Sequence, residues 1–73
     1  MPYIKFSTLA EAKAVNERIT KACIDNSKWT DAITNNYCNP TFDPLAQAWI
    51  VPILEGYEQF FTDAEIEQSM INQ

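Results

Sequence analysis

Hydrophobic and polar positions along this chain recur with two periods, which predict strands as well as helices. The segment Tyr3–Phe6 consists mostly of strand-forming residues and places Ile4 and Phe6 on one face, so we expect a short strand there. From residue 12 onward, apolar residues recur at spacings of three and four, the period of one helix face. That stripe comprises Ala12, Val15, Ile19, Ala22 and Cys23.

Capping residues locate the ends of this helix. Thr8 and Glu11 fit a capping box, in which the hydroxyl and the carboxylate each satisfy a backbone amide of the first turn. We therefore expect the helix to begin at Ser7 or Thr8 and to end near Asn26.

Two further strands joined by a tight turn are predicted in the second half of the chain. Residues 37–42 and 48–54 read as strands, and residues 43–46 have Asp and Pro at the positions that a type I turn favours. Both faces of the later strand are apolar, so we expect it to be either central and covered or part of an interface. Pro40 and Pro52 argue against a central position, because proline cannot donate to a sheet ladder.

The segments on either side of this hairpin complete the expected order of elements. Trp29 and Ile33 are four residues apart, which fits either a short helical turn under the core or a buried loop. Thr62 and Glu65 form a second capping box, so a helix is expected from residue 63 to residue 70 or 71. The simplest arrangement is a small two-layer α+β domain, in the order β-α-β-β-α, with a three-stranded, mainly antiparallel sheet.

Length and composition limit the classes of protein that remain. The 73 residues form one domain, 1–73, and a chain of this size buries only about 60% of its unfolded surface, which leaves room for an oligomer. Histidine is absent, which excludes Ser-His-Asp and Cys-His catalytic sites and His-containing zinc sites. Cys23 and Cys38 are too few for a disulfide-rich scaffold, so we expect a reduced intracellular protein, with one bridge between them under oxidation as a hypothesis. No apolar run approaches the roughly 20 residues of a membrane span, and residues 1–10 do not resemble a signal peptide.

Charge is distributed unevenly between two parts of the chain. Residues 1–28 hold all five basic residues and three acidic ones, a net charge of +2. Residues 29–73 hold seven acidic residues and no Lys or Arg, a net charge of −7. The acidic part repels phosphates, so we expect no direct binding of nucleic acid.

Clustered carboxylates are the only candidates for chemistry, and they form a predicted acidic surface. The cluster comprises Glu55, Glu58, Asp63, Glu65 and Glu67. Asp63, Glu67 and Glu58 offer oxygen ligands for Ca²⁺ or Mg²⁺, but the alternating acidic loop around a central glycine is absent. The positive end of a helix explains Asp63 and Glu65 without a metal. We therefore expect no metal, no cofactor and no enzymatic activity.

Large aromatic residues are concentrated between residues 29 and 61. Seven rings in 33 residues are many for so small an interior, and interface cores are enriched in aromatic residues. These rings form either the core or, in part, a contact surface for a partner or a second copy. The rings belong to Trp29, Tyr37, Phe42, Trp49, Tyr57, Phe60 and Phe61. The predicted interaction surface comprises Trp49, Val51, Ile53, Tyr57, Phe60 and Phe61.

Two sequence blocks, YIKFSTLAEA at residues 3–12 and AWIVPILEGYEQFFT at residues 48–62, resemble small, largely uncharacterised proteins encoded in phages and prophages, often near tail-fibre genes. The two blocks cover about a third of the chain. The resemblance implies a phage origin and an accessory or structural role, in the host cytoplasm or associated with the virion.

The sequence predicts a non-catalytic protein that acts by contact with a protein partner or with a second copy of itself. The alternative is an acidic inhibitor that presents carboxylates where a host nucleic-acid-binding protein expects phosphates. A small carboxylate enzyme is the third reading, but the chain has no nucleophile elbow and no phosphate loop. No membrane partner is expected.

Overall fold

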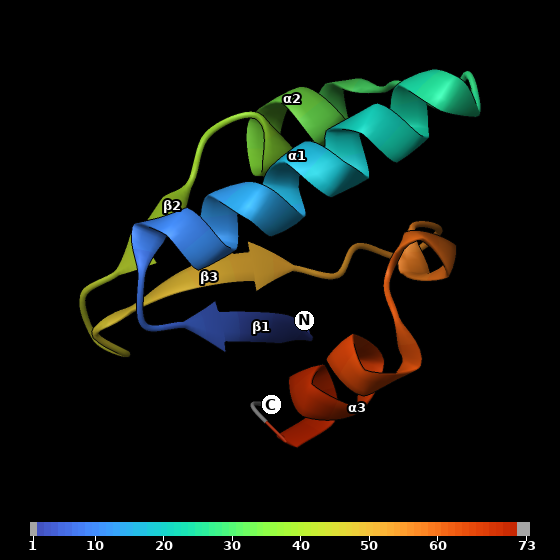
Figure 1. Cartoon of the computed structure of the whole chain (residues 1–73). Coiled ribbons are helices and arrows are strands. Elements are labelled where there is room, and N and C mark those ends of the chain that lie inside the picture. The colour runs from blue at the N-terminus through green and yellow to red at the C-terminus, as the bar shows by residue number, and fades with distance from the viewer. Residues whose placement is uncertain (1, 72–73) are drawn as a thin grey trace.

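The computed structural model describes residues 2–71, which fold into a three-stranded antiparallel sheet with helices packed against it (Figure 1). The α+β class and the antiparallel sheet expected from the sequence are confirmed. A short helix between the first helix and the hairpin makes the order β-α-α-β-β-α. In chain order the elements are β1 (Tyr3–Phe6), α1 (Leu9–Asp25), α2 (Asp31–Tyr37), β2 (Thr41–Asp43), β3 (Ala48–Pro52), the 3-10 turn η1 (Glu58–Phe60) and α3 (Asp63–Ile71).

Helix α1 begins and ends where its capping residues indicate. The hydroxyl of Thr8 accepts a hydrogen bond from the Glu11 amide at 3.3 Å and donates to the Glu11 carboxylate at 2.7 Å. At the other end, Ser27 adopts the left-handed conformation, with φ of 54°. The amide of Ser27 donates to the carbonyl of Ile24, and that of Lys28 donates to the carbonyl of Cys23. These two bonds define a Schellman motif, which normally places glycine at the position that Ser27 occupies here.

The strand predicted at residues 37–42 is wrong for its first four residues. Tyr37 is the last residue of α2 and Cys38 caps that helix, so β2 is only Thr41–Asp43. The preceding segment does contain a short helix, but the expected pair does not pack under the core: Ile33 is buried, whereas Trp29 precedes the helix and is 45% exposed. The second buried residue of α2 is Tyr37, four positions after Ile33. Strand β3 also ends at Pro52 rather than at residue 54.

Strand β3 is central, with β1 and β2 on either side of it. The Ile53 amide donates to the Pro2 carbonyl at 2.9 Å, on the β1 side of the strand. Because the backbone groups of successive strand residues point to opposite sides, those of Pro52 face away from β1. The missing N–H of Pro52 therefore removes no hydrogen bond to β1. On the opposite side, β2 does not extend as far as Pro52, because its first residue, Thr41, pairs with Ile50. The Tyr37 hydroxyl takes its place, donating to the Pro52 carbonyl at 2.6 Å and accepting from the Leu54 amide at 3.3 Å.

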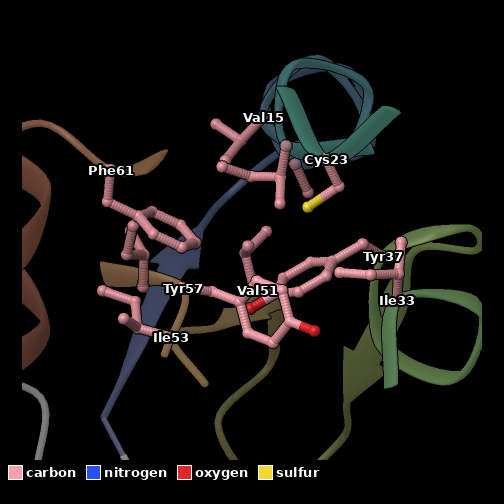
Figure 2. Close-up of a cluster of buried hydrophobic side chains, with 11 residues drawn as sticks. Val15, Cys23, Ile33, Tyr37, Val51, Ile53, Tyr57 and Phe61 are labelled. Carbon is pink, nitrogen blue, oxygen red and sulfur yellow. The ribbon is translucent and has the colours of Figure 1, made fainter. Parts of the chain in front are cut away.

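The helices divide the sheet into a covered and a less covered part. Helices α1 and α2 lie side by side and both pack on β3, whereas α3 packs beside β1 (Figure 1). Ile4 and Val51, paired across β1 and β3, point into the core, while the alternate residues Lys5, Ile50 and Pro52 are exposed or half-buried. The core, most of which is labelled in Figure 2, comprises Ile4, Ala12, Val15, Ile19, Cys23, Ile33, Tyr37, Val51, Ile53, Tyr57 and Phe61. None of the helices within residues 2–71 combines the length and the apolar character needed to cross a lipid bilayer.

Candidate functional site

Most of the predicted interaction surface lies inside the protein. Val51, Ile53, Tyr57 and Phe61 are buried members of the core (Figure 2), so the prediction that they form an accessible surface is wrong. The rings that seemed surplus pack on one another: the ring centroid of Tyr37 lies 6.5 Å from that of Tyr57 and 6.4 Å from that of Phe61. Mutual packing of rings at these distances fills a small core efficiently.

The two remaining members of that set are only partly buried. Phe60 lies in η1, with its ring centroid 6.2 Å from that of Tyr57. Trp49 lies in β3 directly opposite Phe6 of β1 and Phe42 of β2. Phe6, Trp49 and Phe42 therefore form one line across all three strands, which we call the aromatic row.

The aromatic row lies at the hairpin end of the sheet, where α1 has only begun (Figure 1). The rings of Phe42 and Trp49 meet edge to face, with centroids 5.2 Å apart and an interplanar angle of 68°. Phe6 and Trp49 are half-buried, whereas 48% of the Phe42 surface is exposed. Leu45, in the hairpin turn, is almost fully exposed. The row is thus an apolar edge of the sheet that is partly in contact with solvent.

A groove of about 240 Å³ opens along the other side of α1. One wall consists of α1 side chains between Lys13 and Ile24, and the facing wall includes Trp29, Tyr37 and Pro40. We call it the α1–α2 groove. Its exposed apolar rim comes from Ile24, which is 63% exposed, and Trp29, which is 45% exposed. The Trp29 indole is held in place by a hydrogen bond from its Nε1 to the Thr34 hydroxyl at 3.2 Å.

Asn16 is the unusual residue of this groove. It lines the groove with only 3% of its surface exposed. Neither Nδ2 nor Oδ1 has a hydrogen-bond partner among the described residues. A buried amide left without partners costs roughly 1–3 kcal/mol of stability. Both atoms have practically no accessible surface, so a molecule in the groove would reach this amide only after the surrounding side chains had moved.

Sequence reasoning missed Asn16, although a signal was present. The residue follows Ala12 by four positions and precedes Ile19 by three, so it lies on the apolar stripe that predicts α1. A polar amide on an apolar helix face indicates a buried polar side chain. Its lack of partners depends on which side chains of α2 and the following segment face it, and that is a tertiary property.

Two of the predicted acidic residues, Glu58 and Glu65, form hydrogen bonds within the chain. The Glu58 carboxylate accepts hydrogen bonds from the backbone amides of Gly56 and Tyr57. Glu65 accepts from the Thr62 amide at 2.8 Å and forms an ion pair with Arg18, far away in sequence. Partial burial alone would raise the pKa of Glu65, but the hydrogen bonds from Arg18 and Thr62 outweigh it, so this pKa lies below its ordinary value.

The other three predicted acidic residues, Glu55, Asp63 and Glu67, are exposed. Across residues 2–71, no three His, Cys, Asp or Glu side chains come together in a way that would hold a metal ion. The five carboxylates therefore do not gather into one site in the structure.

Cations from the first part of the chain lie against the acidic second part. Lys28 donates from Nζ to the Gly56 carbonyl at 2.9 Å and lies 5.5 Å from the ring centroid of Tyr57. Together with the Arg18–Glu65 pair, this contact partly neutralises the acidic surface. The charge separation seen along the sequence is therefore smaller in space.

Both cysteines are free thiols. Cys23 is buried in the core, and burial raises the pKa of its thiol. Cys38 is exposed at the end of α2, not in a strand as predicted. A raised pKa keeps the Cys23 thiol protonated and unreactive.

No protein-family model, curated protein or solved structure matches this chain. The resemblance to phage and prophage proteins therefore remains a prediction.

Proposed function

We propose that this chain is a non-catalytic interaction protein that binds a protein partner, or a second copy of itself, through the aromatic row. The observation that carries this proposal is the half-exposed Phe42 ring, held edge to face against Trp49 on a rigid sheet. Aromatic side chains at the centre of a patch contribute much of the energy of protein contacts. The contact between the two rings restricts their rotamers before a partner binds, which reduces the side-chain entropy lost on binding.

The roles of the acidic residues support contact rather than chemistry. The Glu58 and Glu65 carboxylates bind backbone amides of their own chain, and Glu65 is also paired with Arg18. Carboxylate oxygens that already accept hydrogen bonds from their own chain are poorly placed to contact a substrate.

We favour protein contact over phosphate mimicry for an electrostatic reason. A phosphate mimic needs an uninterrupted negative surface, but Lys28 and Arg18 lie against the acidic part of the chain. The phage setting, with an accessory or virion-associated role, is part of the proposal and rests on the sequence resemblance alone.

The experiment compares the wild-type chain with Phe42→Ser and, as a control, Leu45→Ser, which removes an exposed apolar residue outside the row. Sedimentation velocity over a concentration series measures self-association. In a second measurement each chain is immobilised, and the amount of bound partner protein per chain is compared. We expect Phe42→Ser to weaken the association at least about tenfold and Leu45→Ser to leave it unchanged. A strictly monomeric wild type that recovers no partner, or equal association by all three chains, would contradict the proposal.

A further inference from the structure

The outer edge of β2 carries one residue whose backbone groups are free to pair with another strand. Since the backbone groups of Pro52 face away from β1, alternation along β3 points those of Ala48 and Ile50 toward β2 as well. The pairs that β2 makes with Ala48 and Ile50 are therefore hydrogen-bonded. The N–H and C=O of the residue between these pairs, Phe42, point outward. No backbone group outside β3 pairs with either of them among residues 2–71.

The two edges of the sheet differ in how far they are covered. Helix α3 packs beside β1 (Figure 1), whereas β3 is the only helix or strand of the described residues against which β2 packs extensively. Thr41 and Phe42 are exposed on this edge. An open edge with an unused donor and acceptor is a template for another strand.

Two prolines limit how far a second strand can pair with this edge. Pro40 and Pro44 lie two positions before and after Phe42, so their groups would be the next to point outward if the strand continued. Neither residue has an N–H to donate. The edge therefore offers a single backbone donor, that of Phe42.

A second copy of this edge matches it in one register only. With Phe42 opposite Phe42 of the second copy in an antiparallel pair, each amide donates to the carbonyl of the other. Opposite Pro40 or Pro44 of the second copy, the Phe42 carbonyl would meet no donor. The register centred on Phe42 also places Thr41 opposite Asp43 of the second copy, so that a hydroxyl donor faces a carboxylate and the two Asp43 side chains are not opposed.

Side chains and preorganisation favour a second copy over a flexible peptide. Residues directly opposite one another in a sheet project from the same face, so the two Phe42 rings would lie side by side and join the two aromatic rows. Only two backbone hydrogen bonds are available, so the cost of ordering the incoming strand decides the outcome. A flexible peptide pays that cost on binding, whereas β2 of a second copy is already held as a strand by β3.

We propose that two copies of this chain associate edge to edge, with their β2 strands paired antiparallel about Phe42 in one continuous sheet. The inference rests on the proposed function, because it names a second copy as the partner of the aromatic row. The contact is two-fold symmetric and each copy contributes the same edge, so association ends at the dimer and does not continue into filaments.

The test removes the Phe42 N–H and leaves the ring in place. Chemical synthesis with ligation at Cys38 gives the full chain with an N-methyl group on the Phe42 amide. The control carries the N-methyl group on Lys5, which pairs with Ile50 and whose amide therefore also points away from β3, at the other edge. Circular dichroism checks that both chains fold like the wild type.

Sedimentation velocity over a concentration series then compares the dimer dissociation constants. Physiological salt screens the repulsion between copies that each carry a net charge of −5. We expect N-methylation of Phe42 to weaken self-association at least about tenfold, because both backbone hydrogen bonds between the copies are lost. N-methylation of Lys5 should leave it unchanged. A monomeric wild type, or equal association by the two N-methylated chains, would overturn the proposal.

Hydrogen exchange of the wild-type chain gives a second readout that needs no modified residue. The Phe42 amide should exchange at least about tenfold more slowly in concentrated than in dilute protein, because pairing protects it. Exchange of the Lys5 amide should not depend on concentration. Exchange at Phe42 that is equally fast at all concentrations would also overturn the pairing.

These outcomes are separable from those of the proposed function. If N-methylation of Phe42 has no effect while Phe42→Ser weakens association, the strand pairing fails and the aromatic row stands. The same holds if the chain is monomeric and Phe42→Ser weakens binding of another protein. If N-methylation weakens self-association while Phe42→Ser leaves it unchanged, the aromatic row fails and the strand pairing stands.

Discussion

The two ends of β3 differ in how completely their groups are satisfied. At the Pro52 end, the Tyr37 hydroxyl pairs with a carbonyl and an amide, and the surrounding rings are buried. At the Trp49 end, the Phe42 ring is half exposed, and on the far side of α1 the Asn16 amide has no partner among residues 2–71. The first region is complete within the chain and explains stability. The second is incomplete, and this difference is what makes it a candidate for binding.

The largest expected change in stability comes from removing the Tyr37 hydroxyl at the Pro52 end of β3. Tyr37→Phe keeps the ring but leaves the Pro52 carbonyl and the Leu54 amide without their shared partner. We expect a loss of about 1–2 kcal/mol in the free energy of unfolding, since two partly buried polar groups lose a hydrogen bond. Urea unfolding measures it, with Tyr3→Phe, at a half-buried position, as the control. A loss no larger than that of Tyr3→Phe would show that the hydroxyl does not replace the missing strand.

Alkaline pH probes the same hydroxyl without a mutation. Burial raises the pKa of Tyr37 to about 12, although the hydrogen bond from Leu54 opposes this shift. Because the folded chain holds this proton more tightly than the unfolded one, its contribution is complete below about pH 10 and is lost as pH rises toward 12. Near pH 11 the loss is about 1.4 kcal/mol. Unfolding of the wild type and Tyr37→Phe along the pH scale checks this: the variant should lack that part of the decline, and parallel curves would contradict it.

A substitution in the incomplete region, at Asn16, should raise the free energy of unfolding instead of lowering it. Asn16→Leu replaces an unpaired buried amide by an apolar group of similar size. We expect the free energy of unfolding to rise by about 1 kcal/mol, whereas most core substitutions lower it. Thermal unfolding beside Asn35→Leu, a change at an exposed position on α2 that should have little effect, gives the comparison. A clear loss of stability in Asn16→Leu would mean that the amide has a structural role in the free chain.

Helix α1 was predictable from sequence, but the contacts that complete the Pro52 end of β3 were not. The spacing of Ala12, Val15 and Ile19 and the cap at Thr8 predict α1, because these signals are local. The strand prediction at Tyr37 is wrong because it relied on the strand propensity of tyrosine. In the structure Tyr37 ends a helix, where it lies four residues after Ile33 and both side chains are buried in the core.

The candidate sites depend on contacts between distant segments. The aromatic row needs the register of three strands, and the Asn16 groove needs the packing of α2 beside α1. No spacing along the chain specifies either of them. The sequence shows that Asn16 is a polar residue on an apolar stripe, but its lack of partners within residues 2–71 and the exposure of the aromatic row depend on the fold.

The smallest expected effect concerns the backbone at the end of α1. Ser27 occupies the left-handed position of the Schellman motif, with φ of 54°, where residues other than glycine are strained. Ser27→Gly should raise the free energy of unfolding by about 0.5 kcal/mol, because relief of strain exceeds the added freedom of the unfolded chain. Urea unfolding measures the change, with Ser27→Ala as the control, because alanine keeps a Cβ at the left-handed position and should give no such gain. An equal gain in both variants would mean that the backbone conformation at residue 27 is not the cause.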